Sequence, residues 1–172
     1  MPLEREVKLK VPEDVDLESF LLRNGGFFLK KEKQIDVYLD FDDFKIKKSG
    51  SAFRIRFSGN YCFLTFKGPQ KEDIVKNREE YEVMVSDGEQ LLKILKSIGL
   101  DEKLRIAKER TTIGYEGLNF EIDVVEGLGK FVEIEIKSDN DIQKVKTIIE
   151  KAGILWSPIL KSYAELLSEK HI

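Results

Sequence analysis

Charged residues of like sign recur two positions apart along this sequence. The pairs are Glu4 and Glu6, Arg54 and Arg56, Glu80 and Glu82, Lys108 and Arg110, and Glu133 and Glu135. Residues i and i+2 of a β-strand point to the same face, roughly 6–7 Å apart. At an effective dielectric constant of about 20, two like charges at that separation cost roughly 2–3 kcal/mol. The spacing therefore predicts sites for ions of opposite sign: a metal ion at the acidic pairs and a polyanion at the basic pairs.

Carboxylates are the main candidate metal ligands. The sequence has one histidine, His171, and one cysteine, Cys62, which makes zinc sites and histidine-based catalysis poor expectations. Oxygen ligands favour Mg²⁺ or Mn²⁺. Without such an ion, Glu133 and Glu135 should repel each other, so neutralising Glu133 should stabilise the metal-free protein.

Arginine is concentrated at the basic positions, although lysine outnumbers it 22 to 7 in the whole chain. Four of the seven arginines lie on the charged strand faces: Arg54, Arg56, Arg78 and Arg110. A guanidinium group suits planar, bidentate contact with oxyanions. A ligand with several phosphates, bridged by a divalent cation, would satisfy the basic and the acidic sets together.

The elements that must position these residues are mostly strands, because apolar and charged residues alternate over much of the chain. The predicted strands span residues 2–11, 27–40, 51–58, 60–67, 78–85, 103–116, 118–125 and 130–137. Apolar residues at helical spacing predict helices over 13–23, 87–98, 139–152 and 161–169. Ser86 and Glu89 are expected to cap the second helix, and the basic run of Lys45, Lys47 and Lys48 is expected to be a solvated loop.

The strands predict a single α+β domain over residues 1–172, built on an eight-stranded antiparallel sheet that closes into a barrel. A one-sided sheet with a solvated face would also alternate, but it would sooner mix charge signs. We expect the charged faces inside, holding their own counter-ions, because a packed core cannot bury unpaired charge. The helices would then cover an apolar outside.

Composition excludes several classes of protein. The 29 basic and 32 acidic residues give a net charge of −3, which argues against a general nucleic-acid binder. No apolar run approaches the roughly 18 residues of a membrane span, and the charged N-terminus is unlike a signal peptide. A single cysteine suggests a reducing compartment. We expect a cytoplasmic protein without nucleic-acid or membrane partners; a homodimer is left open.

Taken together, the motifs resemble those of the CYTH superfamily, the triphosphate tunnel metalloenzymes. That group includes class IV adenylate cyclases, thiamine triphosphatases and inorganic triphosphatases. The matching positions, in the family's order, are Glu4, Glu6 and Lys8; Gln34, Asp36, Tyr38 and Asp40; Arg54 and Arg56; Lys67; Arg78, Glu80 and Glu82; Lys108 and Arg110; Asp123, Glu133 and Glu135; and Lys161, Ser162 and Tyr163.

The resemblance implies a small-molecule triphosphate substrate and a division of roles. Phosphate-binding residues would be Lys8, Arg54, Arg56, Lys67, Arg78, Lys108, Arg110 and Lys161. Metal ligands would be Glu4, Glu6, Glu80, Glu82, Asp123, Glu133 and Glu135. Catalysis would involve Lys8, Glu6 and Glu80. Lys8 could orient the carboxylates, contact phosphate, or transfer a proton after losing its own.

Three functions fit these residues. The first is a metal-dependent triphosphatase that hydrolyses tripolyphosphate or a small organic or nucleoside triphosphate. The second is a class IV adenylate cyclase that converts ATP to cyclic AMP and pyrophosphate. The third is a polyphosphate- or nucleotide-binding module without turnover, which would need the basic residues but not the acidic ones. Hydrolysis is favoured, because no motif that reads adenine is visible.

Overall fold

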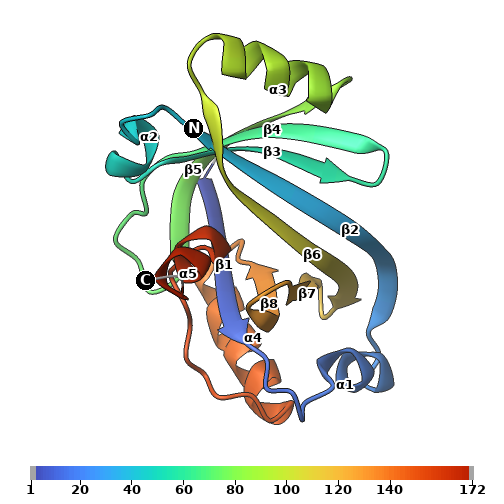
Figure 1. Cartoon of the computed structure of the whole chain (residues 1–172). Helices are drawn as coiled ribbons and strands as arrows, with labels where there is room; N and C mark the ends of the chain where they lie inside the picture. Colours follow the sequence, from blue (N-terminus) through green and yellow to red (C-terminus); the bar gives the residue numbers. More distant parts are fainter. Residues whose placement is uncertain (1–2, 171–172) are drawn as a thin grey trace. The chain divides into compact units, whose positions relative to one another are not determined.

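The computed structural model describes residues 3–170, which form eight strands and five helices (Figure 1). In chain order the elements are β1 (Leu3–Lys10), α1 (Leu17–Arg23), β2 (Phe27–Asp40), α2 (Lys45–Lys48), β3 (Ala52–Ser58), β4 (Tyr61–Lys67), β5 (Lys76–Val85), α3 (Gly88–Ser97), β6 (Asp101–Tyr115), β7 (Leu118–Val125), β8 (Gly129–Glu135), α4 (Asp139–Lys151) and α5 (Tyr163–Lys170). The strands form a closed barrel in the order β1-β5-β4-β3-β2-β6-β7-β8. This confirms the predicted fold class.

The chain packs as two compact units. Unit 1 consists of Lys33–Glu72, Asn77–Lys108 and the described part of Met1–Glu4. Unit 2 consists of Arg5–Glu32, Asp73–Lys76 and the described part of Glu109–Ile172. The organisation as a single domain over residues 1–172 stays a prediction.

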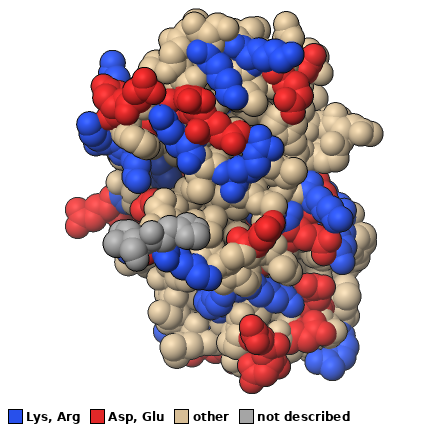
Figure 2. All heavy atoms as spheres, in the orientation of Figure 1, with Lys and Arg blue, Asp and Glu red and all other residues tan. Residues whose placement is uncertain are grey.

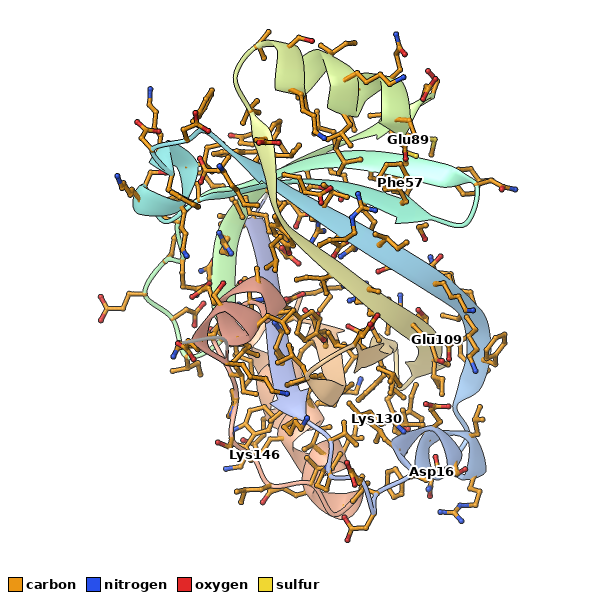
Figure 3. All side chains as sticks on the ribbon, in the orientation of Figure 1. Asp16, Phe57, Glu89, Glu109, Lys130 and Lys146 are labelled. Atoms are coloured by element: carbon orange, nitrogen blue, oxygen red, sulfur yellow. The ribbon has the colours of Figure 1, made fainter. Side chains whose placement is uncertain are left out.

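The core of unit 1 lies between α3 and the strands beneath it. Ile55 of β3 is fully buried, and Leu92 and Leu95 of α3 belong to the same apolar cluster. Phe57 lies where β3 meets α3 (Figure 3), and a Cβ at Gly88 would come within 2.7 Å of its ring. Glycine therefore lets the start of α3 approach β3 closely. The apolar side chains of β3 face the helix, so its arginines face the other way.

The cap of α3 differs from the sequence prediction. Asp87, rather than Ser86, is the N-cap residue, and its side chain accepts a hydrogen bond of 3.0 Å from the backbone N–H of Gln90. Both residues are good N-cap types, and the sequence places them next to each other. The cap is therefore shifted by one residue, while the predicted helix is confirmed.

The core of unit 2 lies between α4 and strands β1, β7 and β8. Val7, Ile134 and Ile149 are fully buried within one apolar cluster, which also includes Leu17 of α1. A capping box at Ser138 and the residues that follow opens α4. As in unit 1, a helix covers the apolar face of the strands and leaves the charged positions on the opposite face.

A short helix replaces the predicted loop over the basic run, since α2 spans Lys45–Lys48. Asp40 holds its start, because its carboxylate accepts hydrogen bonds of 2.9 Å from the backbone N–H groups of Ile46 and Lys47. Phe44 precedes the helix at a φ of 57°, a left-handed conformation. Asp40, six residues upstream of Ile46, thus has a structural role.

Figure 2 shows basic and acidic side chains interspersed over the visible face, in keeping with the small net charge. Within residues 3–170, no helix combines the length and the apolar character needed to cross a bilayer. The expectations of a cytoplasmic location and of no nucleic-acid partner stay predictions.

Candidate functional site

Unit 1 places a buried carboxylate among three cations. Strand register sets Asp36 of β2 opposite Arg56 of β3 and Tyr38 opposite Arg54. Arg56 donates two hydrogen bonds to Asp36, from Nε to Oδ1 at 2.6 Å and from Nη2 to Oδ2 at 2.8 Å. Lys108 Nζ lies 3.5 Å, and Arg54 Nη1 3.9 Å, from the same Oδ2 atom. We call Asp36, Arg54, Arg56 and Lys108 the cation cluster.

The cation cluster carries a net positive charge in a buried setting. Burial alone would raise the pKa of Asp36, which is 1% exposed, but Lys108, Arg56 and Arg54 hold it well below its usual range. Burial would lower the pKa of Arg54, yet Asp36 and Tyr38 raise it. Arg54 Nε is buried and has no hydrogen-bond acceptor among the described residues. Three cations against one carboxylate, with a free donor, have the charge and the hydrogen-bonding capacity that anion binding requires.

A second group in unit 1 lies around Lys67. Its Nζ is 2.7 Å from Glu4 Oε2 and 3.7 Å from Glu80 Oε2. Glu82, next along β5 on the same face, accepts a hydrogen bond of 2.8 Å from Thr65 Oγ1. The structure thus brings Glu4 and Glu80, two predicted metal ligands, together with Lys67, which is predicted to bind phosphate.

Arg78 is held by backbone carbonyl groups rather than carboxylates. Its Nε donates to the Gly68 carbonyl at 2.7 Å, and its Nη2 donates to that of Gly50 at 3.2 Å. These contacts fasten two loops. The predicted contact of Arg78 with phosphate stays a prediction.

Unit 2 contains a cluster in which carboxylates outnumber cations, centred on Arg110. Arg110 donates to Asp123 from Nε and Nη2 at 2.7 and 2.8 Å, to Glu121 at 2.8 Å and to Glu133 at 3.3 Å. Burial would lower the pKa of Arg110, but these three carboxylates raise it well above its usual value. Asp123 is fully buried and also accepts a hydrogen bond of 2.7 Å from the Tyr163 hydroxyl. Asp123 therefore fixes Arg110 from one side.

Lys8 is buried beside these carboxylates. Its Nζ donates to the Lys161 carbonyl at 3.0 Å and lies 3.9 Å from the centre of the Tyr163 ring. Strand register sets Lys8 opposite Glu133. Burial and the neighbouring Lys76 lower the pKa of Lys8 to about 7, although Glu133 and Glu6 oppose the shift.

Glu133 is held by attraction, contrary to the expected repulsion. Burial alone would raise its pKa, but Lys8, a hydrogen bond with Glu6, Lys76 and Arg110 hold it well below its usual range. Glu135, by contrast, is exposed. These contacts argue against the expected gain of stability on neutralising Glu133, because internal cations already balance its charge.

The chain can be assigned to a family from its sequence. The CYTH domain model matches residues 2–166. The chain belongs to the CYTH family. A CYTH relative from Methanocaldococcus jannaschii, named as a candidate adenylate cyclase, is 37% identical and covers 95% of this chain and 98% of its own.

Solved structures share the fold along the whole chain. A Pyrococcus horikoshii protein is 32% identical, with a TM-score of 0.83 over 97% of this chain and 99% of its own. A protein from Hippeastrum, described as a candidate adenylyl cyclase with a dominant triphosphatase activity, is 20% identical, with a TM-score of 0.80 over 97% of this chain and 96% of its own. At that identity the Hippeastrum structure shows the fold alone.

CYTH enzymes act on triphosphates and are in general metal-dependent, which makes the carboxylates of unit 2 candidate metal ligands. Burial raises the pKa of Glu121, and Glu133, Glu6 and Asp123 add to the effect against Arg110. This crowding of oxygen donors fits the chemistry of a hard divalent cation. Among residues 3–170, however, no three such side chains lie ready as a metal site. Since Glu6 Oε1 is 2.9 Å from Lys76 Nζ, a metal ion would have to exchange with internal cations.

Four residues of the charged clusters described above had no role in the sequence-based prediction: Asp36, Lys76, Glu121 and Tyr163. Asp36, Glu121 and Tyr163 were visible as motif or face positions. Strand parity could have paired Asp36 with Arg56 and Glu121 with Arg110, but it says nothing of Tyr163, which lies on α5. Lys76 was missed because β5 begins two residues earlier than predicted. Lys161 has a half-exposed side chain that pairs with Glu169 of α5, so its proposed contact with phosphate stays a prediction.

Proposed function

We propose that this CYTH protein is a triphosphatase that depends on Mg²⁺ or Mn²⁺. The observation that carries the proposal is the cation cluster, in which the buried Arg54 and Lys108 and the half-buried Arg56 converge on one carboxylate. Such a cluster is costly to bury unless an anion compensates it. A phosphate group can take up the donors that Asp36 only partly satisfies.

Within unit 1, Arg54, Arg56 and Lys108 bind phosphate oxygens. Arg54 Nε supplies a buried donor that has no hydrogen-bond partner among the described residues. Arg56 exchanges part of its contact with Asp36 for the ligand, or shares it. Lys67, with its flanking carboxylates Glu4 and Glu80, extends the same charged face along β4 and β5.

Within unit 2, Glu6, Glu121 and Glu133 are the carboxylates best placed to hold a divalent cation, and Glu135 is near in register to Glu6. The ion would offset phosphate charge and lower the pKa of a water molecule. Asp123 is saturated by Arg110 and Tyr163, which favours a positioning role over direct ligation. Lys8 orients Glu133 and can hold or release a proton at Nζ near neutral pH.

Hydrolysis is preferred over cyclisation because it requires less of the site. A triphosphatase must hold the phosphates and a water molecule, whereas a cyclase must also direct a ribose hydroxyl at the α-phosphorus. The name of the Methanocaldococcus jannaschii relative favours the cyclase as the second candidate. A binding module without turnover would not need the crowded carboxylates of unit 2.

The test is release of orthophosphate from tripolyphosphate. Purified protein should release it with Mg²⁺ or Mn²⁺, stop in excess EDTA, and resume when the metal is restored. Full turnover in EDTA, with metal removal confirmed by elemental analysis, would refute the metal-dependent reaction.

A homodimer stays a prediction, to be checked by light scattering.

A further inference from the structure

The inner face of β3, β4 and β5 changes character along the strands of unit 1. Here the inner face means the face opposite the apolar positions Phe53, Ile55 and Phe57. Strand register gives successive rows across this face: Ala52, Lys67 and Glu80; Arg54, Thr65 and Glu82; Arg56, Phe63 and Met84; then Ser58 and Tyr61. Apart from Ala52, the first two rows consist of ionic or polar side chains. The row that contains Arg56 ends in two apolar side chains.

These apolar side chains are open to solvent. Met84 is 63% exposed, Tyr61 is 60% exposed and Phe63 is half-buried. Side chains directly opposite each other on neighbouring strands lie about 5 Å apart. Phe63 therefore lies between Arg56 on one side and Met84 on the other. An exposed apolar residue is ordinary by itself, but here Met84 and Tyr61 flank Phe63, which lies opposite Arg56.

We propose that Phe63, Met84 and Tyr61 form a subsite for the aromatic ring of an organic triphosphate. The inference rests on the proposed function, and it adds to it a binding preference for triphosphates that carry a ring. With phosphates on Arg54 and Arg56, the organic end of the ligand continues along the same face to Phe63. Nucleobases and other aromatic rings stack on such side chains.

The chemistry of the row suits a flat ring better than an inorganic chain of phosphates. Phe63 offers a ring face, and the thioether of Met84 makes favourable contacts with aromatic groups. A cationic guanidinium, here that of Arg56, also packs on aromatic faces. Gln34 of β2 lies opposite Ser58 in register and brings a buried amide to the next row. An amide can both donate to and accept from the edge of a ring.

The test compares ring-bearing and ring-free ligands. Metal-free protein in EDTA is titrated in a calorimeter with ATP, thiamine triphosphate and tripolyphosphate, for the wild type and for Phe63→Ala and Met84→Ala. Val83→Ala is the matched control, because Val83 is 58% exposed on the opposite face of β5. Met84→Ala guards against misfolding of the Phe63 variant, since its side chain is mostly exposed.

For at least one ring-bearing ligand, Phe63→Ala should raise the ratio of its Kd to that of tripolyphosphate about tenfold. Met84→Ala should raise it severalfold, and Val83→Ala should leave it unchanged. An unchanged ratio for both ATP and thiamine triphosphate in both variants would overturn the subsite. The triphosphatase is tested separately, since orthophosphate release from tripolyphosphate does not involve a ring.

Discussion

Arg56 and Asp36 face each other across the β2–β3 pair, joined by hydrogen bonds of 2.6 and 2.8 Å. The carboxylate is 1% exposed and also has Lys108 and Arg54 within 4 Å. One anion thus restrains three cations in the resting protein. A bound phosphate group must compete with Asp36 or share its partners.

Replacing Asp36 by Asn should destabilise the ligand-free protein by about 3–5 kcal/mol, because it leaves the buried Arg54 and Lys108 and the half-buried Arg56 without their counter-ion. Tripolyphosphate should restore more stability to the variant than to the wild type, since it binds the folded state. Urea unfolding with and without tripolyphosphate measures both effects. Asp42→Asn is the control, because that side chain is 98% exposed. Equal stabilisation of Asp36→Asn and wild type would contradict the role of Asp36.

The same carboxylate should make stability depend on pH. Its pKa in the folded protein lies well below its usual range, so its contribution is complete above the unfolded value of about 3.9 and is lost as the pH falls below it. The stability gap between wild type and Asp36→Asn should therefore shrink between about pH 5 and pH 2. A gap that stays constant over this interval would mean that Asp36 is not held as the structure indicates.

Arg56→Ala should weaken binding of tripolyphosphate roughly 10- to 100-fold, because charge-assisted hydrogen bonds to an anion are lost. Lys47→Ala should have little effect, since Lys47 is exposed on α2. Isothermal titration of both variants in EDTA provides the comparison. Similar losses in the two variants would show that the charged face of β3 is not the anion site.

Glu133→Gln should destabilise the metal-free protein by roughly 1–3 kcal/mol, because Glu133 compensates buried cations. The sequence alone predicted the opposite sign. Turnover at saturating Mg²⁺ should also fall, since a proposed ligand is lost. Denaturant unfolding and specific activity are measured together, with Glu135→Gln as the exposed comparison. A more stable Glu133→Gln variant would restore the idea of repelling carboxylates.

The buried Lys8 should penalise stability as the pH falls from about 10 towards 7. In that interval the unfolded chain binds a proton that the folded protein, with a Lys8 pKa of about 7, does not. The stability of the wild type should therefore rise with pH across the interval, and Lys8→Met should remove most of this rise. Urea unfolding at several pH values measures it. The same slope in both proteins would place the titrating group elsewhere.

The fold was predictable because apolar and charged residues alternate along the strands, and this alternation can be read from the sequence. The like-charge pairs indicated which residues share a strand face. In the structure, Asp36 and Arg56 share such a face, and strand register places them opposite each other. The short helix α2 was not predictable, since its start depends on Asp40, which lies outside the local capping pattern. Capping patterns relate residues within about four positions of each other, whereas Asp40 and Ile46 are six positions apart.

The sequence singled out most residues of the charged clusters but not their pairings. Lys108 and Arg110 are two residues apart, yet Lys108 contacts Asp36 whereas Arg110 contacts Asp123. The alternation along a strand predicts which face of the sheet a side chain lies on. Which charged residue it contacts there depends on the order of the strands and on the length of the side chains. The sequence and the structure predict opposite signs for the stability effect of Glu133→Gln for the same reason, because the sequence does not tell that Lys8 lies opposite Glu133.

The most direct test of the triphosphatase follows ATP labelled at the α-phosphate, incubated with the protein and Mg²⁺ or Mn²⁺. Unlabelled orthophosphate and labelled ADP should appear, without cyclic AMP. Thiamine triphosphate and tripolyphosphate, run in parallel, should release orthophosphate wherever they are substrates. Labelled cyclic AMP with pyrophosphate as the main products, or no orthophosphate from any of the three compounds, would contradict the account.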